Sequence, residues 1–122
     1  MVIPVEAPRE KINREMRSGL YALLILKAID DLGESYGYEI VKHIENRSGG
    51  MIKIKDATIY PILRYFSKKG ILESFWTEPS LGIPRKYYRL TPQGKKLLRE
   101  LIEDYERLRK RADAILYGGE KK

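Results

Sequence analysis

The 122-residue chain has no cysteine, which excludes disulfides and thiolate metal ligands. Its longest aliphatic run, Ala22 to Leu26, is five residues, whereas a helix that spans a bilayer needs about 20. The N-terminal residues also lack a signal-peptide pattern, so we expect a cytoplasmic protein with no membrane partner. The one histidine, His43, has no cysteine and no clustered carboxylates beside it. The sequence therefore predicts neither an enzyme nor a cofactor.

Positive charge is in excess, and the excess is local. The chain has 24 Lys and Arg against 17 Asp and Glu, a net charge of +7. Between Asp56 and Arg99 there are nine Lys or Arg and three Asp or Glu, so this segment carries +6 of the total. Phosphate contacts supply most of the sequence-independent affinity of DNA-binding proteins. The charge distribution therefore favours double-stranded DNA as a partner.

The pattern of apolar residues predicts mainly helices within about one domain. Residues 1–8 and 118–122 are expected to be flexible because they lack a helical pattern of apolar residues. Met51 to Lys55 alternates isoleucine with lysine, which favours a minor, half-buried strand. The helices are expected at Glu10–Ser18, Leu20–Leu32, Tyr38–Arg47, Asp56–Lys69, and from Pro92 to about residue 117 after the N-cap Thr91.

Two β-rich segments follow the fourth of these helices. Ile71–Thr77 and Arg85–Leu90 flank a loop that contains Gly82 and Pro84, as expected for a hairpin. Alternation places Tyr88 and Leu90 toward the core and Arg85, Tyr87 and Arg89 on the other face. For Trp76, packing in the core or hairpin is favoured over stacking on an effector. The fold class predicted is α+β, mainly α: a winged helix-turn-helix domain at 9–90 and a dimerisation helix at 91–117.

The helix from Asp56 to Lys69 is the candidate recognition helix. Asp56, its predicted N-cap, is its only acid. Its non-core positions mix short hydrogen-bonding groups, aromatic hydroxyls and cations, which suit base edges and phosphates. The alternative is an ordinary solvated face, but such faces usually balance Glu with Lys, so DNA contact is favoured. These positions are Thr58, Tyr60, Pro61, Arg64, Tyr65 and Lys68.

The last predicted helix shows a heptad pattern. Leu98, Tyr105 and Ala112 recur every seven residues, as do Leu101, Leu108 and Ile115 three residues later. This seam could fold back on its own domain. A helix of about 25 residues would reach nearly 40 Å, however, which exceeds a small domain. Dimerisation is therefore favoured, with Ile12 and Met16 of the first helix as candidates for the same interface.

Four motifs together closely resemble the PadR family of prokaryotic winged helix-turn-helix transcriptional regulators. They are Tyr36–Ile40 (YGYEI), 57–64 (ATIYPILR), 69–72 (KGIL) and 82–94 (GIPRKYYRLTPQG). The resemblance covers about residues 17–117 and fits the short subgroup with a single C-terminal helix. It implies a homodimer that binds palindromic operators, usually as a repressor, with release by a small molecule in many members.

The resemblance also points to individual residues. Tyr38, Thr58, Tyr60, Pro61 and Arg64 would lie near DNA, and Arg85, Lys86 and Tyr87 in the wing. Ile83 stands where the family often has arginine, so one phosphate contact at the wing tip is not expected. With Lys68 and Arg89 from the charge pattern, the predicted DNA contacts are Tyr38, Thr58, Tyr60, Pro61, Arg64, Lys68, Arg85, Lys86, Tyr87 and Arg89.

Two further hypotheses remain open at the level of sequence. A small-molecule effector could bind between the dimerisation helix and the DNA-binding unit, against Tyr21, Trp76 or Tyr105. Alternatively, the chain could be a winged-helix protein-interaction module whose third helix binds an acidic protein. Binding to random duplex DNA at low salt separates this alternative from a DNA-binding regulator.

Overall fold

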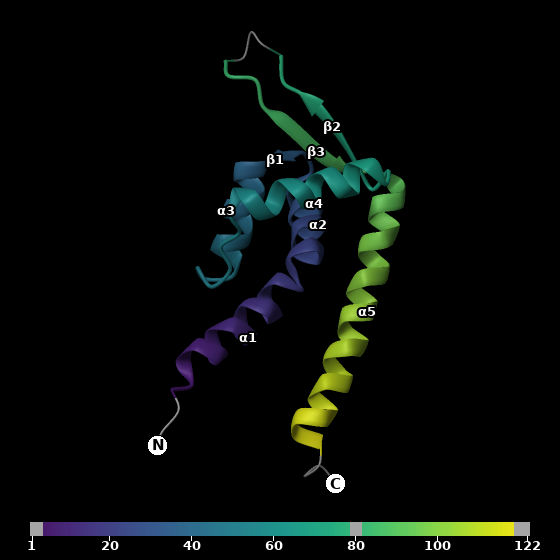
Figure 1. Ribbon diagram of the computed structural model, residues 1–122. Helices are drawn as coiled ribbons and strands as arrows, with labels where there is room; N and C mark the ends of the chain where they lie inside the picture. Colours follow the sequence, from purple (N-terminus) through teal and green to yellow (C-terminus); the bar gives the residue numbers. More distant parts are fainter. Residues whose placement is uncertain (1–3, 79–81, 119–122) are drawn as a thin grey trace.

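The computed structural model describes residues 4–78 and 82–118 and has the predicted fold class (Figure 1). Helices dominate, and the three strands form one antiparallel sheet in the order β1-β3-β2. The β2–β3 hairpin projects as a wing from one end, and α1 and α5 extend from the other. In chain order the elements are α1 (Glu6–Ser18), α2 (Tyr21–Leu32), β1 (Ser35–Tyr36), α3 (Gly37–Arg47), α4 (Asp56–Lys68), β2 (Leu72–Trp76), β3 (Lys86–Leu90) and α5 (Pro92–Tyr117).

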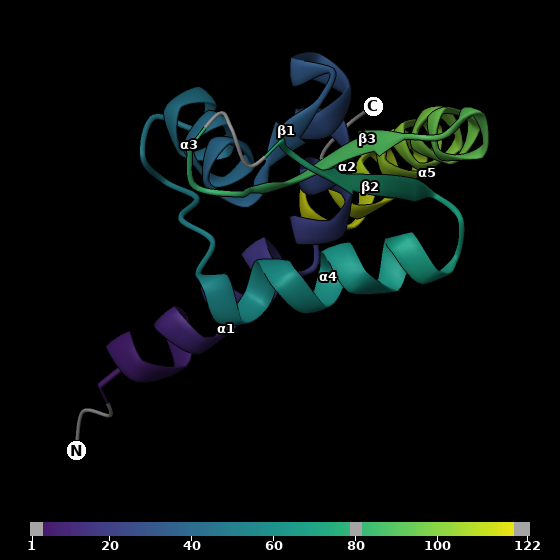
Figure 2. The ribbon, with the colours of Figure 1, turned by 90° about the horizontal axis from the view of Figure 1, so that it is seen from above.

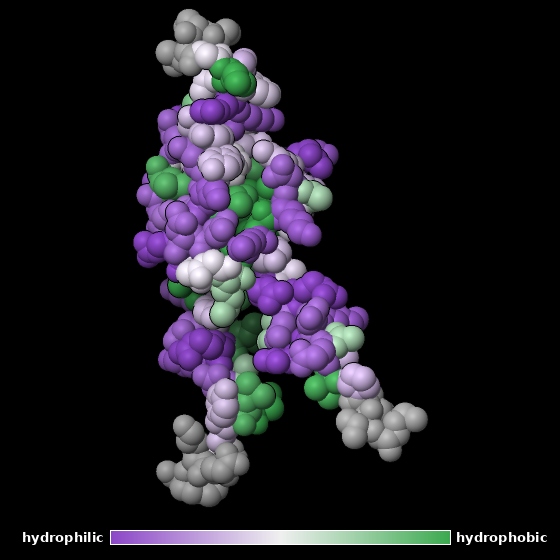
Figure 3. Space-filling view, turned by 90° about the vertical axis from the view of Figure 1, so that its left-hand side faces the viewer, coloured by the Kyte–Doolittle hydropathy of each residue, from purple (hydrophilic) through white to green (hydrophobic). Residues whose placement is uncertain are grey.

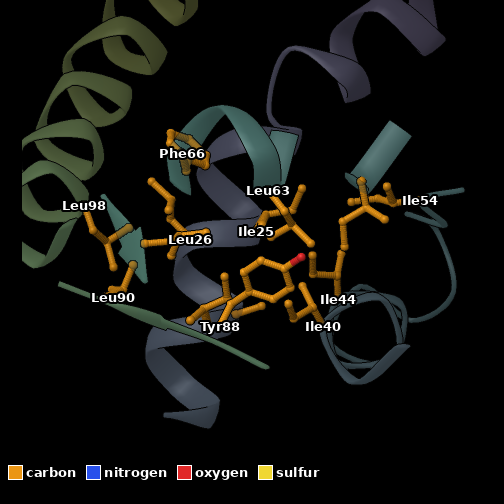
Figure 4. Close-up of a cluster of buried hydrophobic side chains, with 14 residues drawn as sticks. Ile25, Leu26, Ile40, Ile44, Ile54, Leu63, Phe66, Tyr88, Leu90 and Leu98 are labelled. Atoms are coloured by element: carbon orange, nitrogen blue, oxygen red, sulfur yellow. The ribbon is translucent and has the colours of Figure 1, made fainter. Parts of the chain in front are cut away.

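The core lies where α2, α3, α4 and the sheet meet (Figure 4). α2 is at the centre of the core because its residues Ile25, Leu26 and Ile29 are fully buried. Their spacing along the chain places them on one face of the helix. The sheet adds Tyr88 and Leu90, the two residues of β3 that alternation predicts to point inward. The core therefore fixes α4 and the wing relative to each other.

The start of α5 is tied to the end of α4. The Thr91 hydroxyl caps α5 by accepting a hydrogen bond from the Gly94 amide (3.0 Å), and it donates to the Gly70 carbonyl (2.7 Å). The Thr91 amide donates to the Ile71 carbonyl. The predicted N-cap with proline at the first helical position is thus confirmed. Leu98 then buries its side chain in the domain core.

The predicted strand at Met51–Lys55 is wrong. Ile54 is buried and Ile52 partly so, while Lys53 and Lys55 are exposed, so the alternation does describe burial. No strand pairs with this segment in the described part of the chain, and it runs as a loop into α4. The third strand is instead β1, two residues long, which is too short to produce a periodic signal.

Two predicted helix starts also differ from the structure. Lys55 holds the N-cap position of α4 and makes no side-chain cap hydrogen bond, so Asp56 is the first helical residue and acts through its charge in the first turn. α1 begins at Glu6, so residues 6–8 are helical rather than part of a flexible end. Val5 and Gly118, also in the expected flexible ends, hold the cap positions of α1 and α5. Residues 1–3 and 119–122 lie outside the described residues.

Trp76 is not a core residue. At the end of β2 its side chain is 64% exposed. In β2 the buried residue of the core is Leu72, at the other end of the strand. Within the described ranges, no helix combines the length and the apolar character needed to cross a bilayer.

Asp31 links α2 to α3 and makes stability depend on pH. It lies 3.0 Å from Lys27 Nζ and 3.1 Å from His43 Nε2. Hydrogen bonding to Lys27, and less strongly to His43, lowers the pKa of the Asp31 carboxyl, although its burial acts the other way. A pKa lowered in the folded state stabilises the protein above the unfolded pKa, and this contribution disappears as pH falls through the folded value.

We therefore expect Asp31→Asn to lower the free energy of unfolding by about 0.5–1 kcal/mol at neutral pH, because a partly exposed ion pair contributes little. The difference from wild type should shrink as pH falls below about 4. Urea unfolding followed by circular dichroism at several pH values measures it. Asp30→Asn is the control, since Asp30 has no ion pair among the described residues. If both variants lose the same free energy of unfolding, or if the loss in Asp31→Asn does not depend on pH, the stabilising role of the Asp31 ion pairs is contradicted.

Candidate nucleic-acid interface

The outward face of α4 is uncovered. α4 turns Ile59, Leu63 and Phe66 into the core, and its opposite side lies along one edge of the molecule (Figure 2). Asp56 is the only acid on the helix, and it sits at the end where the helix dipole favours a negative charge. The exposed residues of the outward face are Ala57, Tyr60, Pro61, Arg64, Tyr65 and Lys68.

Pro61 lies inside α4 and contributes no backbone N–H. The carbonyl of Ala57, four residues earlier, therefore lacks its usual intrahelical partner. The first turn is held instead by the amides of Thr58 and Ile59, which both donate to the Lys55 carbonyl (2.9 and 3.0 Å). Thr58 is half-buried on the side of α4 that faces α1.

Between α4 and the wing lies a cavity of about 340 Å³. Tyr60 from α4 and Arg85 and Lys86 from the wing all line it. The Tyr60 ring also packs against the start of α3, so closely that a Cβ on Gly37 would lie 2.7 Å from the Tyr60 hydroxyl. The structure thus gathers three of the predicted DNA contacts at the junction of helix and wing.

A row of aromatic rings covers the outer face of the sheet. Tyr36 stacks on Tyr38 (centroids 6.4 Å apart) and contacts Tyr87 (5.3 Å). The Arg85 guanidinium lies 4.6 Å from the centroid of the Tyr36 ring. This cation–π contact orients Arg85, which has no ion pair with the acids of residues 4–78 and 82–118. Tyr38 ends the row at the start of α3 and is 62% exposed. Tyr38, Arg85 and Tyr87 therefore belong to one ordered surface.

Arg89 does not belong with these cations. Its Nε donates to Glu73 (2.7 Å) and its Nη1 to Glu34 (2.8 Å). Two carboxylates already compensate its charge, which argues against the predicted contact with phosphate. The sequence pattern could not show this, because Glu34 is 55 residues away in the chain.

The three aromatic residues proposed for an effector are not together. Tyr21 lines a cavity beside α1, Trp76 lines the cavity between α4 and the wing, and Tyr105 lines neither. The described residues also contain no group of three His, Asp or Glu side chains that could hold a metal ion. Tyr21 and Trp76 thus line two separate cavities, and binding of an effector stays a prediction.

Several cations that the sequence did not single out lie beside α4. Lys53 and Lys55 of the loop and Arg14 and Arg17 of α1 line the same cavity as Thr58. In the sequence, Lys53 and Lys55 alternate with isoleucines. This pattern indicated that the two lysine side chains are exposed, but it did not indicate a binding role. Their proximity to α1 follows from the fold.

The heptad seam of α5 is divided by the domain. Leu98 is buried in the domain core and Leu101 packs partly against it. Tyr105, Leu108, Ala112 and Ile115 are exposed, Leu108 at 69% and Ile115 at 84%. Figure 3 shows hydrophobic side chains at the upper end of the gap between the two projecting parts of the molecule and on the sides of both parts that border it. The first part of the seam thus packs within the monomer, and the rest is left exposed by the described residues.

The chain is similar in sequence to transcriptional regulators. The model of the family described as "Transcriptional regulator PadR-like family" matches residues 25–100. The uncharacterized protein X of Lysinibacillus sphaericus is 37% identical over 85 residues, which are 70% of this chain and 78% of that protein. The transcriptional regulator YqjI of Escherichia coli is 30% identical over 95 residues, 78% of this chain but 44% of YqjI. The chain therefore spans less than half the length of that regulator.

Solved structures of regulators have the same fold over most of their length. A PadR family transcriptional regulator from Eggerthella lenta superposes with a TM-score of 0.82 at 30% identity, covering 99% of this chain and all of the other. A transcriptional regulator from Clostridium thermocellum gives a TM-score of 0.74 at 31% identity, covering 81% and 95% of the two chains.

Proposed function

Since the chain belongs to the PadR-like family of transcriptional regulators, we propose that it is a homodimeric repressor that occupies a palindromic operator in double-stranded DNA. The family accounts for DNA-binding regulation and for the absence of a catalytic constellation in the sequence. One observation carries the proposal further: the outward face of α4 has no acid beyond the first turn and is flanked by the cations of the wing.

The contacts proposed follow from where these side chains lie. Arg64 is exposed at the middle of the α4 face and makes no ion pair among the described residues, so with Thr58 it reads base edges or adjacent phosphates. Arg85 and Lys86 hold phosphates beside the wing. Tyr38, Tyr60 and Lys68 bind the backbone, and Pro61 and Tyr87 shape the surface. Arg89 is left out because its charge is compensated.

The homodimer is supported by the parts of α5 and α1 that leave the domain. α5 has 26 residues, about 39 Å, and its contacts with the core end near Leu101. Beyond that point Leu108, Ile115 and Leu116 are exposed. Exposed apolar residues in such a row are best covered by a second copy, whose two-fold symmetry would present two α4 helices to two half-sites.

The position of Leu98 shifts the proposed boundary between the DNA-binding domain (9–90) and the dimerisation helix (91–117). A division at residue 90 separates the DNA-binding domain from the whole of α5, yet Leu98 is part of the domain core. We therefore assign α5 up to Leu101 to the DNA-binding unit and the remainder to dimerisation. Release by a small-molecule effector remains part of the proposal, with the cavity beside Tyr21 and the cavity beside Trp76 as separate candidate sites.

Arg64→Ala is expected to weaken operator binding about 10- to 100-fold, because loss of a side chain that contacts a base costs about 1–3 kcal/mol. The melting temperature should stay unchanged, since Arg64 is exposed. Fluorescence anisotropy at fixed salt measures this on an operator obtained by selecting bound duplexes from a random pool. Arg111→Ala, an exposed cation of α5, is the control. Unchanged affinity of the Arg64 variant would remove this residue from the interface.

Random duplex DNA tests the function as a whole. Wild-type protein should bind a mixed-sequence duplex at low salt and lose affinity steeply as salt rises, because released counterions drive the binding. No binding even at low salt would favour the alternative, a winged-helix module that binds an acidic protein.

A further inference from the structure

A second basic surface lies on the side of α4 away from the wing. α1, the loop at residues 51–55 and the N-terminal turn of α4 enclose a cavity of about 590 Å³. Thr58, one of the proposed DNA contacts, is part of its lining. One acid, Glu15, also lines it, together with the cations Lys11, Arg14, Arg17, Lys53 and Lys55.

Most of these cations lack a carboxylate partner. Lys11 pairs with Glu15 (2.5 Å), but Arg14, Arg17, Lys53 and Lys55 make no ion pair anywhere in residues 4–78 and 82–118. In α5, by comparison, Arg107 and Arg109 are paired with acids of their own helix. A cavity lined by unpaired charges of one sign concentrates a positive field, which attracts an anion.

We propose that Arg14, Arg17, Lys53 and Lys55 bind the sugar–phosphate backbone of the DNA whose major groove α4 enters. The anion is assigned to DNA because the cavity reaches α4 itself through Thr58. This inference rests on the proposed function and extends it to a region that the recognition helix and wing do not include.

The arrangement of the elements supports a contact of this kind. The wing lies on one side of α4, and α1 and α5 extend on the other (Figure 1). α1 and α4 also face the same side of the molecule (Figure 2). Backbone contacts from the wing and from α1 would thus flank α4, the α1 contact on the side of the dimer centre. Two flanking contacts fix the register of the helix in the groove.

α1 can serve DNA and the dimer at the same time because the two roles use opposite faces. Lys11, Arg14 and Ser18 are three, four and seven residues apart and line the cavity. Val5, Ile12 and Met16 have the same kind of spacing on the other side of the helix, where they are exposed. A second copy that covers the apolar face would leave the basic face open.

The double variant Arg14→Gln, Lys53→Gln tests the proposal. Both side chains are exposed, so the fold should persist, which thermal unfolding checks. Affinity for the selected operator and for a 30-base-pair mixed-sequence duplex should fall by the same factor, at least about tenfold. The slope of log affinity against log salt should become shallower by about 2, one for each cation removed. The double variant Lys110→Gln, Arg111→Gln is the control, because it removes the same amount of charge from α5. It should change neither the affinity for DNA nor the slope of log affinity against log salt.

Hydroxyl-radical footprinting of the operator supplies an independent measurement. The double variant should lose protection of the backbone between the two half-sites, while protection within each half-site remains. Unchanged affinity and salt slope, an equal loss in the α5 control, or a loss confined to the operator would each overturn the inference. Wild-type protein that binds no duplex would instead refute the proposed function, so the two failures are distinguishable.

Discussion

Replacing Gly94 with alanine is expected to lower the free energy of unfolding by about 3 kcal/mol. Gly94 lies in the first turn of α5, where a Cβ would stand 2.2 Å from the carbonyl oxygen of Ile71. That atom belongs to the backbone at the entrance to β2 and cannot rotate away. It also accepts a hydrogen bond from the Thr91 amide (3.1 Å) and lies 3.1 Å from the Thr91 hydroxyl, whose one proton it shares with the Gly70 carbonyl. The methyl group would force α5 away from the domain and break this attachment.

Gly19→Ala is the matched control for Gly94→Ala. Gly19 has an ordinary helical φ of −64°, and a Cβ there would meet its nearest neighbours at 3.5 and 3.7 Å, normal contact distances. Its replacement should be neutral or slightly stabilising, because alanine restricts the unfolded chain. Urea unfolding monitored by circular dichroism compares the two variants. If Gly94→Ala is as stable as Gly19→Ala, the close approach of α5 to Ile71 is not what positions this helix.

The second large effect concerns assembly. Leu108→Glu together with Ile115→Glu is expected to raise the dissociation constant of the dimer by at least about 1000-fold, roughly 4 kcal/mol. Each substitution would bury a carboxylate in an apolar seam without a partner. Both side chains are largely exposed in the monomer, so the fold should survive. Operator affinity should fall as well, because one α4 helix then binds without the other.

Sedimentation equilibrium at micromolar concentration measures the change in mass. The control variant is Lys110→Glu with Ala114→Glu, which places carboxylates at exposed positions of α5 outside the heptad seam. It should remain dimeric. A wild-type monomer at this concentration, or a dimer that persists with both seam positions changed to glutamate, would contradict dimerisation through α5.

The recognition helix illustrates how far the sequence could be interpreted. The sequence assigned Tyr60, Arg64 and Lys68 to the non-core face of α4, and the structure leaves them exposed. Thr58, assigned to the same face, is half-buried. The N-cap was assigned to Asp56 instead of Lys55, because a capping preference describes the residue type and not the backbone conformation that it adopts. The heptads of α5 were also recognised, but nothing in their regularity distinguishes Leu98, which the domain buries, from Ile115, which it leaves exposed.

Local patterns thus determined the helices, the wing strands and the basic surplus between Asp56 and Arg99, since these depend on neighbours in the chain. Tertiary structure decided which charges remain free, because that depends on residues far apart. The charge of Arg89, for example, is compensated by the carboxylates of Glu34 and Glu73. Residues 1–55 have nine Lys or Arg against eight Asp or Glu and look nearly neutral, yet the fold brings α1 and the loop at 51–55 together around one basic cavity.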